Sequence, residues 1–260
     1  MKIGFIGSGN ISRFHIDALK NNNFIVEAIG TRNGSKNCFK IANDLNLLNK
    51  YCVKGWEEVL NKNVDAFCLC VDITKTPEIL LEILEIGIPV LVEKPVAWQI
   101  KDIDKVSKHP NKDKIFVAYN RRYYKTLNTL KEKCNKSEKG GTVIVNIPDS
   151  ILGIKQFLSN GCHMIDSLRY ILGDFEIKEK LIKFDENKKD IASISALCKN
   201  EKFNILLNAH SLIPSNFSIT INLSELVYEL KPLEKLTIYR GMEIIEPTIE
   251  EPIRRYTVSY

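Results

Sequence analysis

The chain has 260 residues, of which 44% are hydrophobic and 27% charged, and its formal net charge is +5 at pH 7. This composition is typical of an ordinary soluble globular protein, long enough for two modest domains. No stripe of Arg and Lys interleaved with aromatic residues marks a nucleic-acid surface, and no apolar run approaches the ~20 residues of a membrane span.

Seven scattered cysteines without a C-x-x-C pair favour a reducing compartment over a disulfide framework or a zinc site. A glycine turn lies so close to the start that we expect no signal peptide before it. The sequence therefore predicts a cytoplasmic protein with no metal, nucleic-acid or membrane partner.

The first residues carry a partial dinucleotide-binding fingerprint. Residues 2–6 form a predicted strand, and Gly7 and Gly9 follow it at the required spacing. Gly7 permits a tight turn, Gly9 lets a pyrophosphate approach the backbone, and the next helix presents unpaired N–H groups to the phosphates. The third glycine is replaced by Ser12. The predicted phosphate-binding residues are Gly7, Ser8, Gly9, Asn10 and Ile11.

Strand and helix patterns alternate through the rest of the first half. Further strands are expected at 24–29, 51–53, 64–71, 88–92 and 115–119, which makes about six. This alternation predicts an α/β fold, a doubly wound parallel Rossmann sheet with ligands at the carboxyl ends of its strands. We place this dinucleotide-binding domain at residues 1–122.

The pattern changes in the second half. Helices are expected at 123–134 and 162–172, with a strand at 142–147 between them. Strand-like runs then recur at 177–184, 191–198, 203–209, 217–223, 227–230 and 236–239. Turn-separated runs of this kind predict a mainly antiparallel sheet. Residues 123–260 are therefore expected to form an α+β domain for substrate binding and oligomerisation.

The residues after the second strand bear on the choice of cofactor. An acid there would accept from the ribose hydroxyls of NAD, whereas this chain has Thr31 and Arg32. A guanidinium suits bidentate recognition of a 2′-phosphate, so the sequence favours NADP, with NAD possible. Asp72 and Thr74 follow the 64–71 strand and are further cofactor candidates.

Two side chains have the chemistry of a hydride-transfer site. Lys94 lies at the carboxyl end of the 88–92 strand, where an ammonium can steady developing charge on an oxygen. His163 begins a predicted helix, and an imidazole can take or return the proton of an alcohol. His15, on the first predicted helix, could approach the cofactor, but we interpret it as a solvated helix histidine.

Four segments together carry a family resemblance. They are Gly7-Ser8-Gly9, Gly30-Thr31-Arg32-Asn33, Val92-Glu93-Lys94-Pro95 and Gly161-Cys162-His163-Met164-Ile165-Asp166. With them the chain resembles the glucose-fructose oxidoreductase, inositol dehydrogenase and rhizopine catabolism family of NAD(P)-dependent sugar oxidoreductases. The resemblance implies that Glu93 and Lys94 lie in the nicotinamide site and that His163 handles the proton. It also implies a homodimer or homotetramer formed through the open face of the second sheet.

One departure from the family concerns the substrate. Many members have an aspartate where this chain has Ser159, and those acting on nucleotide sugars often manage with lysine and histidine alone. We therefore expect a nucleotide-linked or amino sugar of surface-glycan synthesis. The candidate substrate contacts are Arg121, Arg122, Ser159, Asn160 and Asp166.

Two alternatives remain open at this point. One is a catalytically silent, nucleotide-sensing regulator of the same fold, and the other is a reductase of imines or linear tetrapyrroles. Relatives commonly continue beyond the point where Arg254-Arg255-Tyr256 stands here. The chain is therefore expected to be either a short member or one that lacks a closing element.

Overall fold

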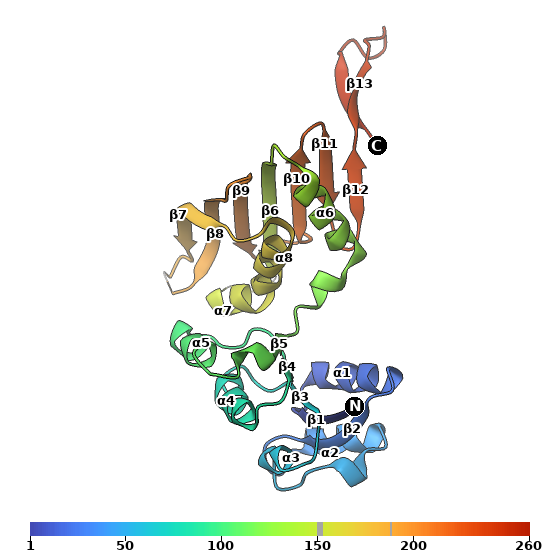
Figure 1. Cartoon of the computed structure of the whole chain (residues 1–260). Coiled ribbons are helices and arrows are strands. Elements are labelled where there is room, and N and C mark those ends of the chain that lie inside the picture. The colour runs from blue at the N-terminus through green and yellow to red at the C-terminus, as the bar shows by residue number, and fades with distance from the viewer. Residues whose placement is uncertain (150–152, 188) are drawn as a thin grey trace. The chain divides into compact units, whose positions relative to one another are not determined.

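The structure, a computed structural model, describes residues 1–149, 153–187 and 189–260. The chain divides into two compact units, Met1–Ala118 and Tyr119–Tyr260, labelled by element in Figure 1. The division falls a few residues before the boundary expected after Arg122.

The N-terminal unit is a parallel sheet with helices on both faces, as predicted. Its sheet has the order β2-β1-β3-β4-β5, and every neighbouring pair is parallel. The elements are β1 (Lys2–Ile6), α1 (Asn10–Asn21), β2 (Ile25–Gly30), α2 (Lys36–Asp44), η1 (Leu48–Lys50), α3 (Glu57–Leu60), β3 (Ala66–Leu69), α4 (Thr76–Ile86), β4 (Val90–Val92), α5 (Ile100–Ser107), η2 (Lys112–Lys114) and β5 (Ile115–Val117).

The expected sixth strand at 51–53 is only a single bridge. Tyr51 pairs with Ile29, and the Cys52 N–H donates to the Ile29 carbonyl at 2.8 Å. The chain then turns away at Gly55, whose φ is +123°. A ladder cannot extend past this turn, so the apolar run ends after one pair.

Side-chain alternation along the strands decides which helices cover which face. Ile3 and Phe5 of β1 pack with Ile16 of α1 and with the buried residues of α2. Ile6 faces the other way, into a cluster that includes residues of α3, α4 and α5. The strand order reverses between β1 and β3, so the switch point, where ligands bind in such sheets, lies at their carboxyl ends.

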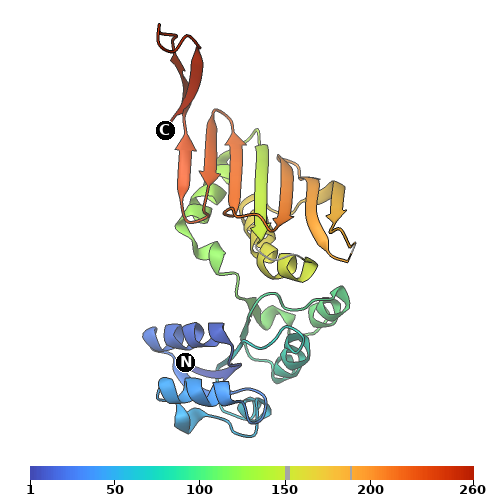
Figure 2. The same ribbon diagram turned by 180° about the vertical axis from the view of Figure 1, so that it is seen from behind.

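The C-terminal unit is built on a seven-stranded sheet of order β12-β11-β10-β6-β9-β8-β7, seen from its two sides in Figures 1 and 2. Neighbours are antiparallel except for the parallel pair β6 and β9. The elements are η3 (Asn120–Tyr123), α6 (Lys125–Lys136), β6 (Gly141–Asp149), α7 (Ile154–Gln156), the π-helical turn η4 (Phe157–Gly161), α8 (Cys162–Leu172), β7 (Glu176–Phe184), β8 (Ile191–Lys199), β9 (Phe203–Ser211), β10 (Ser218–Leu223), β11 (Leu226–Leu230) and β12 (Leu236–Tyr239).

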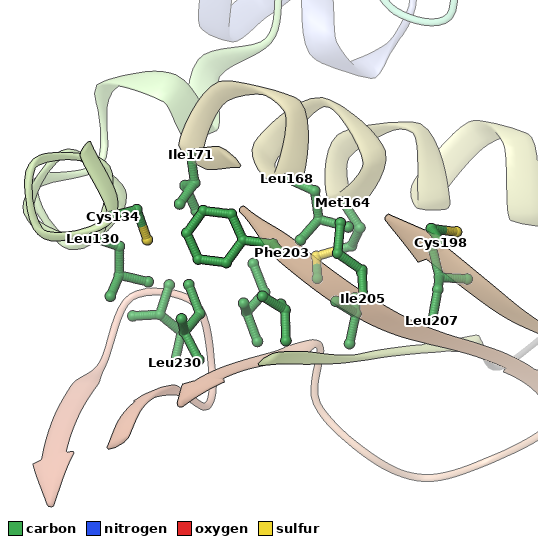
Figure 3. Packing of buried hydrophobic residues seen from close by; sticks show 14 of the residues in the cluster. Leu130, Cys134, Met164, Leu168, Ile171, Cys198, Phe203, Ile205, Leu207 and Leu230 are labelled. Atoms are coloured by element: carbon green, nitrogen blue, oxygen red, sulfur yellow. The ribbon is translucent and has the colours of Figure 1, made fainter. Parts of the chain in front are cut away.

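Helices α6 and α8 cover one face of this sheet and form its core. Leu130 of α6 and Met164 and Leu168 of α8 pack against Phe203 and Ile205 of β9, as Figure 3 shows. On the opposite face, which Figure 2 presents, no helix of the described chain lies over the strands. The predicted mainly antiparallel α+β fold is therefore confirmed.

A hairpin that the sequence did not predict follows the sheet. Strands β13 (Gly241–Ile245) and β14 (Arg255–Ser259) pair antiparallel and form a separate two-stranded sheet. The residues that connect its two strands are rich in Glu and Pro, which are poor strand formers. The Tyr260 ring lies 5.2 Å from that of Tyr239, which joins the hairpin to the end of β12.

We expect Gly7→Ala to destabilise the N-terminal unit. Gly7 has φ +126°, and a Cβ there would lie 2.0 Å from the Cys70 carbonyl oxygen. Backbone strain alone costs about 1–3 kcal/mol. Urea unfolding followed by tryptophan fluorescence measures the change, because both tryptophans, Trp56 and Trp98, belong to this unit.

Gly9→Ala is the matched control for this prediction. Its added Cβ would meet nothing within 4 Å, and the φ of Gly9 is −72°. We expect stability within about 0.5 kcal/mol of the parent. Equal unfolding midpoints for the two variants would contradict the account of the turn.

Candidate functional site

The glycine turn draws three strand ends together at the switch point. The Gly7 N–H donates to the Gly30 carbonyl of β2 at 2.8 Å, and the Cys70 N–H donates to the Ile6 carbonyl at 2.7 Å. Gly9 is the N-cap residue of α1, exposed and with open space around it. The predicted phosphate-binding residues thus lie where the first N–H groups of α1 are available.

The segment after β2 is tied directly to the glycine turn. The side-chain amide of Asn37 donates to the Ser8 carbonyl, and the hydroxyls of Ser8 and Ser35 lie 3.4 Å apart. Ser35 also caps α2 by accepting from the Cys38 N–H. The loop bearing Thr31, which is half-buried, and Arg32, which is exposed, therefore lies beside the predicted phosphate site.

After β3, Asp72 and Thr74 form a compact turn that leads into α4. The N–H and hydroxyl of Thr74 donate to Asp72 Oδ1 at 2.9 and 2.5 Å. These hydrogen bonds lower the pKa of Asp72, because they stabilise its ionised form. Both residues are exposed and lie after β3, next to the switch point.

After β4, Glu93 is held from two sides. Its Oε1 lies 2.6 Å from Nε2 of His15 on α1, and its Oε2 accepts the Lys94 N–H at 3.1 Å. Burial pushes the pKa of Glu93 up, but the bond and charge of His15, the Lys94 N–H and the Lys94 charge together lower it. The Lys94–Pro95 peptide bond is cis.

The interpretation of His15 as a solvated helix histidine is wrong. Its side chain is only 23% exposed and pairs with Glu93, 78 residues away in the sequence. A partner so distant leaves no local signal. In the fold, His15 lies one helical turn after the fully buried Ser12, so both side chains project from the same face of α1.

These features fit a nicotinamide dinucleotide. Gly9 leaves open space at the N-terminus of α1, where an added side chain would project. The carboxyl ends of β1 and β3 flank that point, and Lys94 follows the neighbouring strand β4. A bound dinucleotide would be held by residues 7–11 and by the loops after β2, β3 and β4.

In the C-terminal unit, Arg122 and Asp166 hold each other. Arg122 Nε and Nη2 donate to the two carboxylate oxygens of Asp166 at 2.9 and 2.5 Å. The Asp166 side chain is 8% exposed, whereas that of Arg122 is 46% exposed. This bidentate pair fastens η3 to α8, and a substrate contact for either residue stays a prediction.

Arg121 has a different environment. Its guanidinium lies 5.0 Å from the centroid of the Phe217 ring, and Nη1 is buried with no partner among the described residues. A buried donor of this kind costs free energy until an acceptor reaches it. Arg121 therefore has hydrogen-bonding capacity for a ligand.

The π-helical turn η4 leads directly into the helix that carries His163. Ser159 and Asn160 belong to that turn, and the Asn160 amide donates to Asp149 Oδ2 of β6 at 3.2 Å. Sequence reasoning looked for a carboxylate at Ser159 and missed Asp149, which ends β6 and is brought to the turn by the fold. π-Helical turns are frequent at functional sites.

His163 packs edge-on against an aromatic ring. The centroids of the Tyr119 and His163 rings lie 6.2 Å apart, at an interplanar angle of 78°. Burial, and then the charges of Cys162 and Asp166, raise the pKa of Tyr119 to about 12, so its hydroxyl stays protonated at neutral pH.

A cavity of about 570 Å³ opens beside this pair in the C-terminal unit, within the usual size range of small-molecule sites. Arg122 and Asp166 contribute to its wall, as does Tyr119, whose ring contacts that of His163. The lining residues are Tyr119, Arg122, Lys131, Phe157, Leu158, Cys162, Ile165, Asp166, Arg169, Tyr170 and Asp174.

Among residues 1–149, 153–187 and 189–260, no group of three or more His, Cys, Asp or Glu residues is arranged to hold a metal ion. In the same ranges, each helix is too short or too polar to span a bilayer.

A parallel sheet with a glycine turn and a lysine at its carboxyl edge defines a dinucleotide-binding oxidoreductase domain. Residues 1–120 match the model of an oxidoreductase family with an NAD-binding Rossmann fold. The resemblance to the glucose-fructose oxidoreductase, inositol dehydrogenase and rhizopine catabolism family, which the motifs predicted, is therefore confirmed over these residues. A nicotinamide dinucleotide as cofactor is confirmed at this level, and the preference for NADP stays a prediction.

Solved structures share the fold over nearly the whole chain. The WlbA dehydrogenase from Bordetella pertussis, solved in complex with NADH and UDP-GlcNAcA, is 18% identical with TM-score 0.75, covering 92% of this chain and 82% of its own. The UDP-N-acetylglucosamine 3-dehydrogenase GnnA from Acidithiobacillus ferrooxidans is 14% identical with TM-score 0.77, and the match covers 100% of this chain and 82% of GnnA.

A third similar structure is the super-repressor mutant of Gal80p from Saccharomyces cerevisiae. It is 14% identical with TM-score 0.77, covering 100% of this chain and 79% of its own. The fold thus occurs in proteins with and without a dehydrogenase name. No curated protein matches the sequence significantly.

We expect Asp166→Asn to destabilise the C-terminal unit by about 1–3 kcal/mol, because it removes one acceptor and the charge from the buried partner of a bidentate pair. Urea unfolding followed by circular dichroism measures this. Asp174→Asn is the matched control, since Asp174 pairs with Arg169 at 2.5 Å but is 81% exposed, and such pairs contribute about 0–1 kcal/mol. Equal losses would refute the assignment of Arg122 and Asp166 as the structural tie.

Proposed function

We propose that the protein is an NAD(P)-dependent oxidoreductase that transfers a hydride between nicotinamide and a carbon of a nucleotide-linked or amino sugar. The observation that carries this proposal is the dinucleotide cradle of the N-terminal unit, with Lys94 following the strand next to the switch point. The substrate class is supported by WlbA, solved with UDP-GlcNAcA, and by GnnA, named for UDP-N-acetylglucosamine.

The chemistry of each step follows from the side chains. When bound, the nicotinamide accepts the hydride in the oxidative direction and supplies it in the reductive one. Lys94 donates a hydrogen bond to the reacting oxygen of the sugar and stabilises its developing negative charge. His163 accepts the hydroxyl proton as the alcohol becomes a carbonyl, and returns it in the reverse direction.

The remaining substrate contacts are proposed from the predicted set. Arg121 has a buried N–H without a partner among the described residues, which suits an acceptor such as a sugar hydroxyl or a diphosphate oxygen. Ser159 and Asn160 lie in the turn just before His163, and Asn160 is bonded to Asp149. Arg122 and Asp166 add polar groups to the wall of the cavity.

We also propose NADP as the preferred cofactor. Arg32 is exposed shortly before the N-terminus of α2, and residues 31–37, which follow β2, include no Asp or Glu that could accept from a ribose. A guanidinium with the adjacent helix N-terminus attracts a 2′-phosphate through charge and N–H donors.

A homo-oligomer, acting in the cytoplasm, completes the proposal. The helix-free face of the seven-stranded sheet exposes a stripe of apolar side chains, Ile144, Leu181, Leu197 and Leu206, which are 39 to 77% exposed. Neighbouring strands align this stripe in register, since Ile144 pairs with Leu206 and Leu206 with Leu197. Such a face suits a symmetric contact between copies, and a monomer in light scattering would contradict it.

A silent regulator that senses the dinucleotide is the second candidate, favoured by the similarity to a repressor and by Ser159 in place of a carboxylate. It would bind NADPH or NADH without turning over any sugar. Turnover therefore separates the two functions.

We expect the protein to oxidise or reduce a nucleotide sugar when UDP-linked and amino sugars are screened by the absorbance of reduced nicotinamide. Lys94→Met and His163→Asn should each lower kcat about 10²–10⁴-fold, as removal of an acid–base or oxyanion group does. Lys75→Met is the control, because Lys75 is exposed and pairs only locally with Glu78. Dinucleotide binding without turnover of any such sugar would instead favour the regulator.

A further inference from the structure

The segment Glu93-Lys94 is anchored to two separate elements of the N-terminal unit. Its backbone is held by β3, since the Glu93 N–H donates to the Leu69 carbonyl at 2.9 Å. Its side chain is held by α1, since Glu93 Oε1 lies 2.6 Å from His15 Nε2. One residue therefore links the end of β4 both to the sheet and to the helix that begins at the glycine turn.

The other carboxylate oxygen of Glu93 contacts the backbone of Lys94. Oε2 accepts the Lys94 N–H at 3.1 Å, so the carboxylate bridges the His15 ring and the Lys94 backbone. Only 19% of the Glu93 side chain and 23% of the His15 side chain are exposed. Water therefore competes weakly for either hydrogen bond, and charge-assisted bonds of this kind are among the stronger ones in proteins.

The charge state of Glu93 supports the same geometry. Its carboxyl is ionised at neutral pH, because the surrounding donors lower its pKa despite burial. An ionised carboxylate accepts hydrogen bonds only, so His15 Nε2 must carry the proton that they share. The imidazole thus has one defined donor role towards Glu93.

His15 lies near the N-terminus of α1, on the helix that begins at the glycine turn. α1 begins at Asn10, and His15 follows five residues later, which is about 7.5 Å along the helix axis. The same rigid helix therefore presents its N-terminus at the phosphate site and its imidazole at the Glu93-Lys94 segment.

We propose that His15 is a positioning residue, which fixes the Lys94 backbone through the Glu93 carboxylate and aligns it with the dinucleotide held at the start of α1. The hydride-transfer part of this inference rests on the proposed function. The structural part, that His15 restrains Lys94, stands apart from any activity.

The amide of Lys94 gives a direct readout of that restraint. His15→Ala removes the donor to Glu93, frees the carboxylate to turn into solvent, and should speed hydrogen exchange at the Lys94 amide at least tenfold. His15→Gln keeps an N–H donor at a similar reach and should restore most of the protection. Pro95 has no backbone N–H, so it adds no exchanging amide to a peptide that ends at Pro95. The amide closest to the end of that peptide is then the one of Lys94.

The chain offers a matched control in His109. Its Nε2 lies 3.1 Å from Glu85 Oε1, but this second histidine–glutamate pair joins α4 to the end of α5, and the Glu85 side chain is 80% exposed. His109→Ala should leave the exchange of Lys94 within twofold of the parent. Tm values of all variants separate local release from general destabilisation.

Two results decide the proposal. Fast Lys94 exchange in His15→Ala, recovered in His15→Gln and absent in His109→Ala, supports it; unchanged exchange in His15→Ala, or equal acceleration in His109→Ala, overturns it. If the parent turns over a sugar, kcat should fall more than tenfold in His15→Ala with KM changed less than threefold, and recover in His15→Gln. If the parent turns over none, the proposed function fails while the exchange result still decides the restraint.

Discussion

The close approach of the Gly7 backbone to the ends of β2 and β3 is the constraint on which the candidate site depends. Its N–H bonds to Gly30, and the Cys70 carbonyl occupies the space that any side chain would need. Because residue 7 is glycine, β1 can end between β2 and β3, and α1 can begin three residues later. The gap at the switch point, the exposed N-terminus of α1 and the placement of the loop after β2 all follow from that turn.

Helix α1 also connects the glycine turn to the segment that follows β4. A helix that is fixed at its start by the glycine turn carries His15 to Glu93, and Glu93 in turn reaches the Lys94 backbone. The predicted phosphate-binding segment and the segment that carries Lys94 are therefore both attached to α1. The C-terminal unit uses a comparable device, in which Asp166 accepts both hydrogen bonds of Arg122 and ties η3 to the helix of His163.

Much of this was predictable from local patterns. Alternating apolar runs predicted both sheets, and the glycine spacing predicted the turn after β1, because each depends on a few neighbouring residues. The single-pair bridge at Tyr51 was mistaken for a strand, since only the left-handed backbone of Gly55 ends it. The β13–β14 hairpin was missed because the residues between its strands are rich in Glu and Pro and it joins neither larger sheet.

The contacts of individual side chains were less accessible. Neither the His15–Glu93 bond nor the Asn160–Asp149 bond has a local signature, since each joins elements that only the tertiary fold brings together. The parallel pairing of β6 with β9 has the same origin, because periodicity shows a strand but not its neighbour. The chemistry of the residues indicates which side chains can bind or react, and the tertiary fold determines which of them contact one another.

The most direct test of the account is to titrate the full chain with NADPH and with NADH, following the fluorescence of the reduced nicotinamide. The account predicts saturable binding of both, tighter for NADPH because we propose that the Arg32 guanidinium pairs with its 2′-phosphate. Tighter binding of NADH would contradict the role of Arg32 and leave the cradle standing. Binding of neither would contradict the central claim that the glycine turn and the ends of β1 and β3 form a dinucleotide site.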